Sequence, residues 1–404
     1  MRAKRNLVVF ASLAVTAAIA LPVLAQRGPT SGPVARYDMR AGTVSGMAAM
    51  GGGMGGAMGM MLGRGGSRTQ HELYLRLGSG RGPEKGAPKA DHFMPPSAKL
   101  GKSVALVTPQ DERVPEGFPE GRRPKGRLLV FWGCGEHAPK GQPVVIDFAK
   151  LAAGQAPAGL WTSTIIRDWG PTKANSKTFG RWPAEDGKFV KADSSLLGTH
   201  RIAGNYAPEI GFTLSKDFMG ALTSSTGSLP SGATLLRWNA LSDATGYLAT
   251  LMGGKMSGQG EMGDMVMWTS SASRQFGGGL TDWLSPAQVA GLVKDRTLLA
   301  PSVTTCTIPA EVRAAAPDFR MGTLSAFGPE ESFAYPPRPA DPKAAWNLEW
   351  TARVRHRSMT SWMDMAGMAG MAGQDPNQAP PPNDKCKPKG GLGGLLGGMV
   401  KPGC

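Results

Sequence analysis

Methionine is the residue type with the most evident chemical potential in this chain, because its 22 copies are strongly clustered. Six lie within residues 47–61, five within 252–267 and five within 359–371, so three short windows hold 16 of the 22. A thioether is a soft, neutral ligand that prefers Cu(I) or Ag(I) to hard cations. The glycines around the first and third windows make the backbone flexible, so that several sulfurs can converge on one ion.

The Met-x-Met and Met-x-x-Met spacings resemble the methionine-rich segments of periplasmic copper-handling proteins. That resemblance implies a Cu(I) site, but histidine, which usually accompanies methionine there, is absent from all three windows. The alternatives are plain flexible linkers and sacrificial targets for oxidation. The candidate ligands are Met47, Met50, Met54, Met58, Met60, Met61, Met363, Met365, Met368 and Met371. No other cofactor is expected.

Tryptophan supplies the second candidate site. Trp169 precedes Gly-Pro and Trp182 precedes Pro, and turn residues flank both, so we expect two exposed rings. Exposed aromatic rings on β-sandwich domains can stack on sugars, so both are predicted ligand-binding residues. Core packing is the alternative for any aromatic residue in such a fold, and it is the interpretation we give Trp238.

Catalytic and zinc-binding patterns are weak in this sequence. Cys134-x-x-His137 lacks the further ligands of a zinc site and is interpreted as a structural cysteine beside a surface histidine. Gly78-Ser79-Gly80 is not followed by a helical pattern, so it predicts neither a phosphate loop nor a nucleophile elbow. We therefore predict no catalytic residues. A β-sandwich hydrolase whose residues are far apart in sequence is the remaining enzymatic alternative.

The N-terminus has the pattern of an export signal. Three cationic residues within positions 2–5 precede an apolar run, Leu7–Leu24, and the run ends in Val-Leu-Ala before Gln26. This is typical of a cleaved Sec-type signal peptide, with an uncleaved anchor as the alternative. The predicted location is the periplasm or the exterior.

Such compartments permit disulfides, and the four cysteines, Cys134, Cys306, Cys386 and Cys404, allow three pairings. Local closure of Cys386 with Cys404 is the simplest pairing. Cys134 and Cys306 lie in separate predicted folded regions, where they either link those regions or stay buried and free.

The charge balance limits the class of partner. The formal net charge is +15, and it falls to +12 once the three cationic residues of the leader are removed. Outside the cytoplasm nucleic acid is not an expected partner. We expect an envelope protein or a glycan, acidic glycans among them, with peripheral contact to an anionic membrane surface. The alternative is that the positive charge serves only to keep an exported protein soluble.

Strand patterns dominate the region 67–222. His71–Leu77 alternates polar and apolar residues, which places Leu73, Leu75 and Leu77 on one face. Further strands are predicted at 103–108, 127–132, 143–148, 160–167 and 210–214. Because long helical patterns are missing, this region is predicted to be an irregular β-sandwich.

The next region starts after a Ser/Thr/Gly linker at 223–231. Ala233–Trp238 followed by Gly246-Tyr247 resembles a fibronectin type III or related immunoglobulin-like domain, in which Trp ends the second strand and Gly-Tyr opens the third. The resemblance covers about a third of the chain. It implies strands at 265–269, 304–309, 319–327 and 349–357. A short helix within 284–298, capped by Ser285, departs from the plain fold.

The last of these strands is itself patterned. Its alternation places Trp350, Ala352 and Val354 on one face and Arg353, Arg355 and Arg357 on the other.

Together these patterns predict an all-β protein with two β-sandwich domains and flexible flanks. The expected organisation is a signal peptide at 1–25, a disordered Gly/Met linker at 26–66, sandwiches at 67–222 and 223–358, and a disordered tail at 359–404. The leading functional hypothesis is an exported, non-enzymatic envelope-binding or scaffold protein. The alternatives are a Cu(I)-buffering protein and the hydrolase described above.

Overall fold

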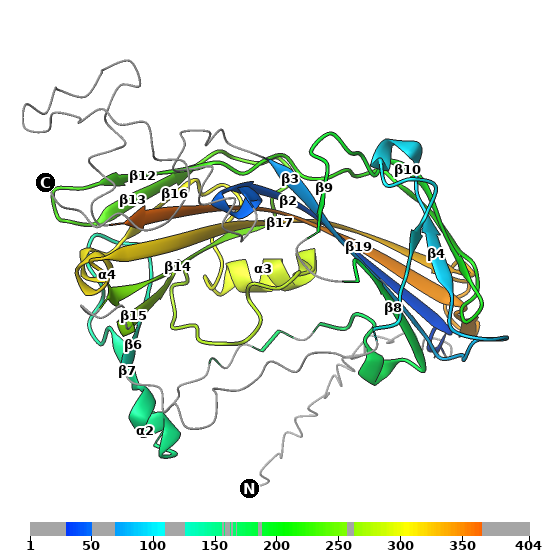
Figure 1. Cartoon of the computed structure of the whole chain (residues 1–404), viewed down its shortest axis with the longest axis horizontal. Coiled ribbons are helices and arrows are strands. Elements are labelled where there is room, and N and C mark those ends of the chain that lie inside the picture. Colours follow the sequence, from blue (N-terminus) through cyan, green and yellow to red (C-terminus); the bar gives the residue numbers. More distant parts are fainter. Residues whose placement is uncertain are drawn as a thin grey trace, which may run out of the picture.

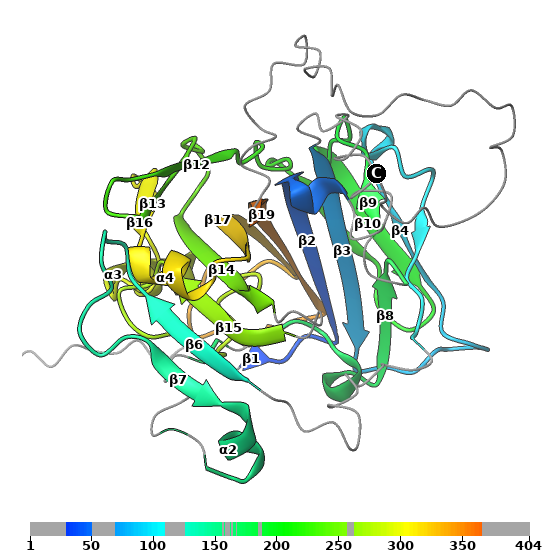
Figure 2. The ribbon, with the colours of Figure 1, turned by 60° about the vertical axis from the view of Figure 1, so that its left-hand side comes forward.

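The computed structural model describes residues 30–50, 69–109, 126–155, 157, 162, 165–166, 168–184, 188–256 and 262–365. The described chain is mainly β, as expected. It forms one large mixed sheet of ten strands, a four-stranded sheet, a three-stranded sheet and a short two-stranded pair (Figure 1). Figure 2 shows the two small sheets near opposite ends of the large one.

The large sheet contains strands from both predicted domains. Its order is β7-β6-β15-β14-β17-β19-β2-β3-β8, with β9 beside β3. The strands are β2 (Ala35–Gly46), β3 (Gln70–Ser79), β6 (Arg127–Trp132), β7 (Val144–Asp147), β8 (Thr178–Trp182), β9 (Phe189–Val190), β14 (Gly246–Met256), β15 (Met262–Thr269), β17 (Phe319–Tyr335) and β19 (Trp350–Met365). The pairs β19–β2 and β15–β6 are parallel, and the other pairs are antiparallel.

Strand β2 corrects the expectation that residues 26–66 are a disordered linker. Ala35–Gly46 lies between β19 and β3, near the middle of the large sheet. Its sequence alternates as a strand should: Tyr37 and Met39 are buried in a hydrophobic core, whereas Arg36 and Asp38 occupy the opposite face. The Gly/Met composition of the following residues masked this pattern.

The four-stranded sheet closes the first core. Its order is β11-β10-β4-β5, formed by β4 (Ala90–Phe93), β5 (Val104–Ala105), β10 (Gly198–Gly204) and β11 (Ile210–Leu214). Leu73, Leu75 and Leu77 of β3 are fully buried in this core, which confirms their predicted common face. Most of the predicted strand at 160–167 lies outside the described residues.

The three-stranded sheet closes the second core. Its order is β12-β13-β16, formed by β12 (Ser224–Ser228), β13 (Thr234–Trp238) and β16 (Thr305–Ile308), so part of the expected 223–231 linker is a strand. Trp238 is buried there, as predicted, with its ring 5.5 Å from that of Tyr247. A disulfide between Cys134 and Cys306 joins the segment after β6 to β16.

Two long strands run through the whole large sheet (Figure 1). β17 and β19 contribute to both cores, with Trp350 in the first and Leu324 in the second. The register of β17 shifts between Phe327 and Glu330. At that shift a Cβ on Gly328 would lie 2.8 Å from the carbonyl oxygen of His356, so only glycine fits without movement.

The end of β19 corrects a second expectation. Residues Met359–Met365 belong to the strand and not to a disordered tail. Pairing with β17 satisfies their backbone, and it continues through Phe319 opposite Met365.

The predicted helix is present as α3 (Pro286–Lys294), and Ser285 caps it by accepting from the backbone N–H of Gln288. Val289 and Leu292 are buried beneath it against Leu248 and Phe327, on the sheet face opposite the second core. The remaining elements are short: α2 (Phe148–Ala152), α4 (Ala310–Ala315), η1 (Met47–Met50), η2 (Pro96–Ala98), η3 (Lys173–Asn175), and the paired β1 (Thr30–Ser31) and β18 (Trp346–Asn347). None of the helices in the described part of the chain is long and apolar enough to cross a membrane.

Candidate functional site

The outer face of the large sheet carries an array of arginines on the side away from the first core. Three strands contribute to it in adjacent positions. The alternation of β19 places Arg353, Arg355 and Arg357 on this face, as predicted, while Trp350, Ala352 and Val354 enter the core. The other members are Arg36 and Arg40 on β2 and Arg76 on β3.

Two aspartates hold these guanidiniums together. Asp38, whose side chain is 1% exposed, accepts from Arg40 Nε at 2.8 Å and from Arg355 Nη2 at 2.9 Å. It also accepts from Arg353 Nε at 3.1 Å. Asp168, which comes from the segment before η3, pairs with Arg40 and lies 3.3 Å from both Arg353 and Arg355.

This cluster has an excess of positive charge. Arg40, Arg76, Arg353 and Arg355 face two carboxylates, which leaves a formal excess of two positive charges. Burial lowers the pKa of Arg355, and the attraction of Asp38 is opposed by repulsion from Arg353 and Arg40. A partly buried face with this imbalance favours the approach of an anion.

The neighbouring arginines also shift the pKa of the Asp168 carboxyl group. Burial alone would raise its pKa, but the charges of Arg40 and Arg355 outweigh that effect and lower the pKa to about 2. A carboxyl group that is ionised throughout the neutral range cannot serve as a general acid there. Asp168 is therefore a counter-ion to the arginines and not a general acid in the neutral range.

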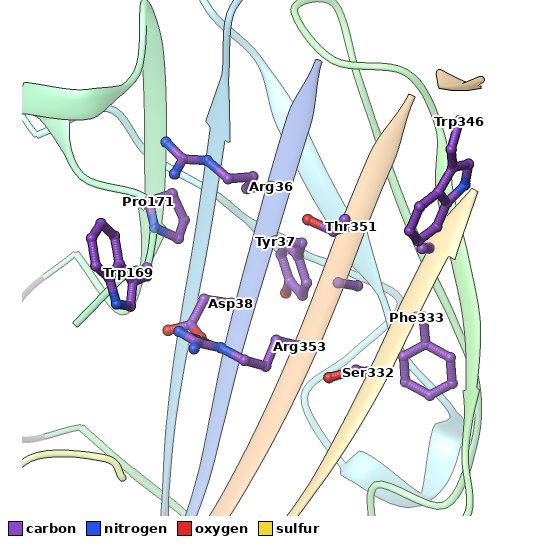
Figure 3. A pocket seen from close by; sticks show the side chains of 13 residues that line it. Arg36, Tyr37, Asp38, Trp169, Pro171, Ser332, Phe333, Trp346, Thr351 and Arg353 are labelled. Atoms are coloured by element: carbon purple, nitrogen blue, oxygen red, sulfur yellow. Dashed lines mark hydrogen bonds and ion pairs between the residues drawn. The ribbon is translucent and has the colours of Figure 1, made fainter. Parts of the chain in front are cut away.

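A pocket of about 440 Å³ adjoins this cluster. Figure 3 shows Trp169 on one side of it and Trp346 on the other, with Arg36 and Arg353 between them. The guanidinium of Arg36 donates to the carbonyl oxygen of Asn175 at 2.8 Å and makes no ion pair with any described residue. The ring of Trp346 is itself covered by the guanidinium of Arg338, 5.4 Å from the ring centroid.

The two predicted tryptophans occupy different environments. Trp169 is 69% exposed and lines the pocket, so its expected exposure is confirmed. Trp182 is only 8% exposed and belongs to the first core, so the expectation that its ring is exposed is wrong. The alternation of β8 turns Trp182 inward, and Lys188 covers its ring at 5.2 Å.

The predicted methionine ligands are only partly described. Met47 and Met50 form the ends of η1, and Met363 and Met365 lie near the end of β19. Met54, Met58, Met60, Met61, Met368 and Met371 lie outside the described residues. The first and third windows begin next to each other, because Gly46 pairs with Ser361 and the backbone N–H of Ala48 donates to Ser361 Oγ.

The remaining candidates have structural partners. Cys134 is bonded to Cys306, and the ring of His137 lies 3.2 Å from the carboxylate of Glu311. Within the described residues no group of three or more His, Cys, Asp or Glu side chains is arranged to hold a metal ion.

Sequence reasoning missed Arg36, Asp168 and Trp346 as site residues. The alternating Arg-x-Asp-x-Arg of residues 36–40 carried a usable signal, since it repeats the pattern predicted for 353–357. Nothing local in the sequence indicates that Asp168 and Trp346 meet those strands, because both contacts depend on the paths of long connections.

Comparison with known proteins adds no assignment to this geometry. No protein-family model matches the chain, and no curated protein matches it either.

Proposed function

We propose that this protein is exported and binds an acidic glycan of the cell envelope in the pocket between Trp169 and Trp346. The observation that carries the proposal is the combination of two indole rings with two guanidiniums in one open pocket. Sugar rings stack on indole faces, and arginine binds carboxylates and phosphates through paired hydrogen bonds.

The electrostatics favour an acidic over a neutral sugar. The arginine array keeps an excess of two positive charges after its internal ion pairs are counted, and Arg36 adds a further cation at the pocket. A uronate or a phosphorylated sugar would offset this charge, whereas a neutral sugar would not. The role is binding and scaffolding, and we assign no reaction to it.

The disulfide supports export. Cys134 and Cys306 are separated by 172 residues, yet they are joined in the folded chain. Disulfides persist in oxidising compartments and are rare in the cytosol, so this bond agrees with the signal-peptide pattern of residues 1–25. A periplasmic or secreted location follows as part of the proposal.

We further propose that the two ends of the protein are two β-sandwiches that share the large sheet, the second of them fibronectin-III-like. Three strands, β12-β13-β16, face four, β15-β14-β17-β19, across the second core. Counted along the chain from β12, and leaving out the short β18, the three-stranded sheet holds the first, second and fifth strands. The facing strands lie in the order fourth, third, sixth and seventh, and this is the arrangement of the fibronectin type III family. The extension of β17 and β19 into the first core is the departure from it.

Titration calorimetry of the purified protein with acidic oligosaccharides tests the binding proposal. Trp169→Ala and Arg36→Ala should each weaken binding at least tenfold, about 1.4 kcal/mol. Ile165→Ala is the matched control, since Ile165 is 70% exposed and does not line the pocket. Binding that survives both pocket variants unchanged would overturn the proposal.

A further inference from the structure

A row of four methionines crosses the outer face of the large sheet at the end away from the glycan pocket. Met267 of β15 pairs with Met252 of β14, Met252 pairs with Met321 of β17, and Met321 pairs with Met363 of β19. Residues that pair directly across strands project from the same face of a sheet. The four side chains therefore stand side by side on the consecutive strands β15, β14, β17 and β19, whose order Figure 2 lets the reader follow.

The two central methionines of this row are exposed to solvent. Met252 is 49% exposed and Met321 is 52% exposed, and the two face each other on adjacent strands. Met267 and Met363 are half-buried on either side of them. The opposite face of the same strands is occupied by the second core, where Leu251 and Val266 are buried. Met267 packs against the small cluster of Leu128, Val130 and Ile146 on its own face, whereas Met252 and Met321 belong to none of the hydrophobic clusters of the described residues.

The described residues in the rows next to these methionines offer no carboxylate and no imidazole ligand. One neighbouring row holds Thr269, Thr250, Thr323 and Ser361, and the other holds Met265, Gly254 and Phe319. None of these described neighbours carries a charge. A site with neutral thioethers and without carboxylate or imidazole disfavours Mg²⁺, Ca²⁺ and Zn²⁺ and favours a soft monovalent ion.

We propose that Met252, Met321 and Met363, with Met267 beside them, form a surface site for Cu(I) or Ag(I). Neighbouring strands lie about 4.8 Å apart, and the unbranched methionine side chain has three rotatable torsions, so sulfurs from three adjacent strands can meet at one ion. Binding is simple coordination, with no change in oxidation state and no proton released. Met321 lies outside all three methionine windows, and long-range pairing alone brings it into the site.

Anaerobic competition titration of Cu(I) against a chromophoric chelator tests the site. The wild-type protein should bind one equivalent, and the triple variant M252L/M321L/M363L should bind at least tenfold more weakly. Leucine keeps the apolar surface and similar volume while removing the sulfur, so a face that serves only as an apolar docking surface would not register the change. A cooperative urea-unfolding transition shows whether the triple variant is folded. If it is not folded, the single variant Met321→Leu is used instead, and it should also bind Cu(I) more weakly than the wild type.

Two controls make the result decisive. Met39, Met94 and Met219 are buried in the two cores, so M39L/M94L/M219L removes as many sulfurs without touching the row and should bind normally. M54L/M58L/M60L/M61L should also bind normally, since it alters only the first window. Loss of binding in that variant with retention in the row variant would overturn the proposal.

The pH dependence gives a second readout. Thioethers need no deprotonation, so affinity should be the same at pH 5.5 and pH 7.5 after correction for the chelator. Affinity that falls at the lower pH would indicate histidine or carboxylate ligands and would contradict the assignment.

Discussion

Asp38 is the residue on which the arginine array depends. Its carboxylate is buried on the sheet face and accepts hydrogen bonds from Arg40, Arg353 and Arg355. Arg355 is almost as deeply buried, with a side chain 3% exposed. Buried charges of this kind are tolerated only when they are paired.

Asp38→Asn should therefore destabilise the protein by about 3–5 kcal/mol, because it keeps the shape but removes the charge that compensates buried guanidiniums. Urea unfolding measures the change. Asp193→Asn is the matched control: Asp193 pairs with Lys99 at an exposed position, and its loss should leave the urea midpoint unchanged. Equal midpoints for wild type and D38N would contradict this role for Asp38.

Two buried histidines, His92 and His200, should make the stability of the protein depend on pH. In the first core, Leu196 O can only accept, so His200 Nε2–H donates to it at 2.7 Å. His200 Nδ1 then accepts from His92 Nε2–H at 3.0 Å, and His92 Nδ1 accepts from the Tyr37 hydroxyl at 2.6 Å. Both rings are neutral in this chain of bonds. Burial lowers the pKa of His92, and of His200, below the ordinary value of 6.5.

Because the unfolded chain binds protons that these buried rings reject, the protein should lose stability as pH falls below about 6.5. Each such histidine contributes a slope of up to about 1.4 kcal/mol per pH unit. His92→Gln should flatten the slope, since glutamine can accept from Tyr37 and donate to His200 but does not titrate. Unfolding free energies from urea titrations at pH 5 to 7.5 provide the measurement. Identical values across this range in the wild type would contradict the argument.

At the scale of the element, the disulfide joins the large sheet to the three-stranded sheet across the second core. It closes a loop of 172 residues, so it restricts the unfolded chain strongly. The free energy of unfolding of the double variant C134S/C306S should be about 3–5 kcal/mol lower than that of the wild type. C386S/C404S, outside the described residues, is the control and should unfold like the wild type. An equal denaturant midpoint for both double variants would contradict this role.

Individual strands were more predictable than the sheet that they form. β6 and β11 match their expected limits, and the two faces of 349–357 were assigned correctly, because an alternation of period two is a local signal. The parallel pairs β19–β2 and β15–β6 join residues far apart in sequence, and no local pattern encodes such pairing. β2 was missed for a different reason: the residues that follow it are rich in glycine and methionine, and this composition suggested that the whole region was a linker.

The candidate sites also divide into residues that a local sequence pattern indicates and residues that only the tertiary structure brings in. Trp169 was found from its turn context, and the methionine windows from composition. Arg36, Trp346 and Met321 enter their sites only through tertiary pairing or long connections, which sequence patterns do not reveal.

At the scale of the molecule, one sheet has two faces with different roles. The first is covered by the two small sheets over two cores. The second carries α3 near its middle, where Arg355 and Arg357 donate to the backbone oxygens of Trp283 and Thr281. The arginine array with its pocket lies on one side of that helix and the methionine row on the other. β19 joins them, since Arg353 and Met363 project from the same face of this strand.

The proposed function requires that the pocket between Trp169 and Trp346 recognises an acidic sugar. The most direct measurement compares calorimetric binding of one uronate oligosaccharide with that of its carboxyl-reduced, neutral counterpart, each at 50 and 300 mM salt. We predict that the acidic form binds, that its affinity falls at high salt because the attraction is screened, and that the neutral form binds at least tenfold more weakly. Equal affinities for the two forms, or binding of neither, would contradict the proposed recognition of an acidic sugar.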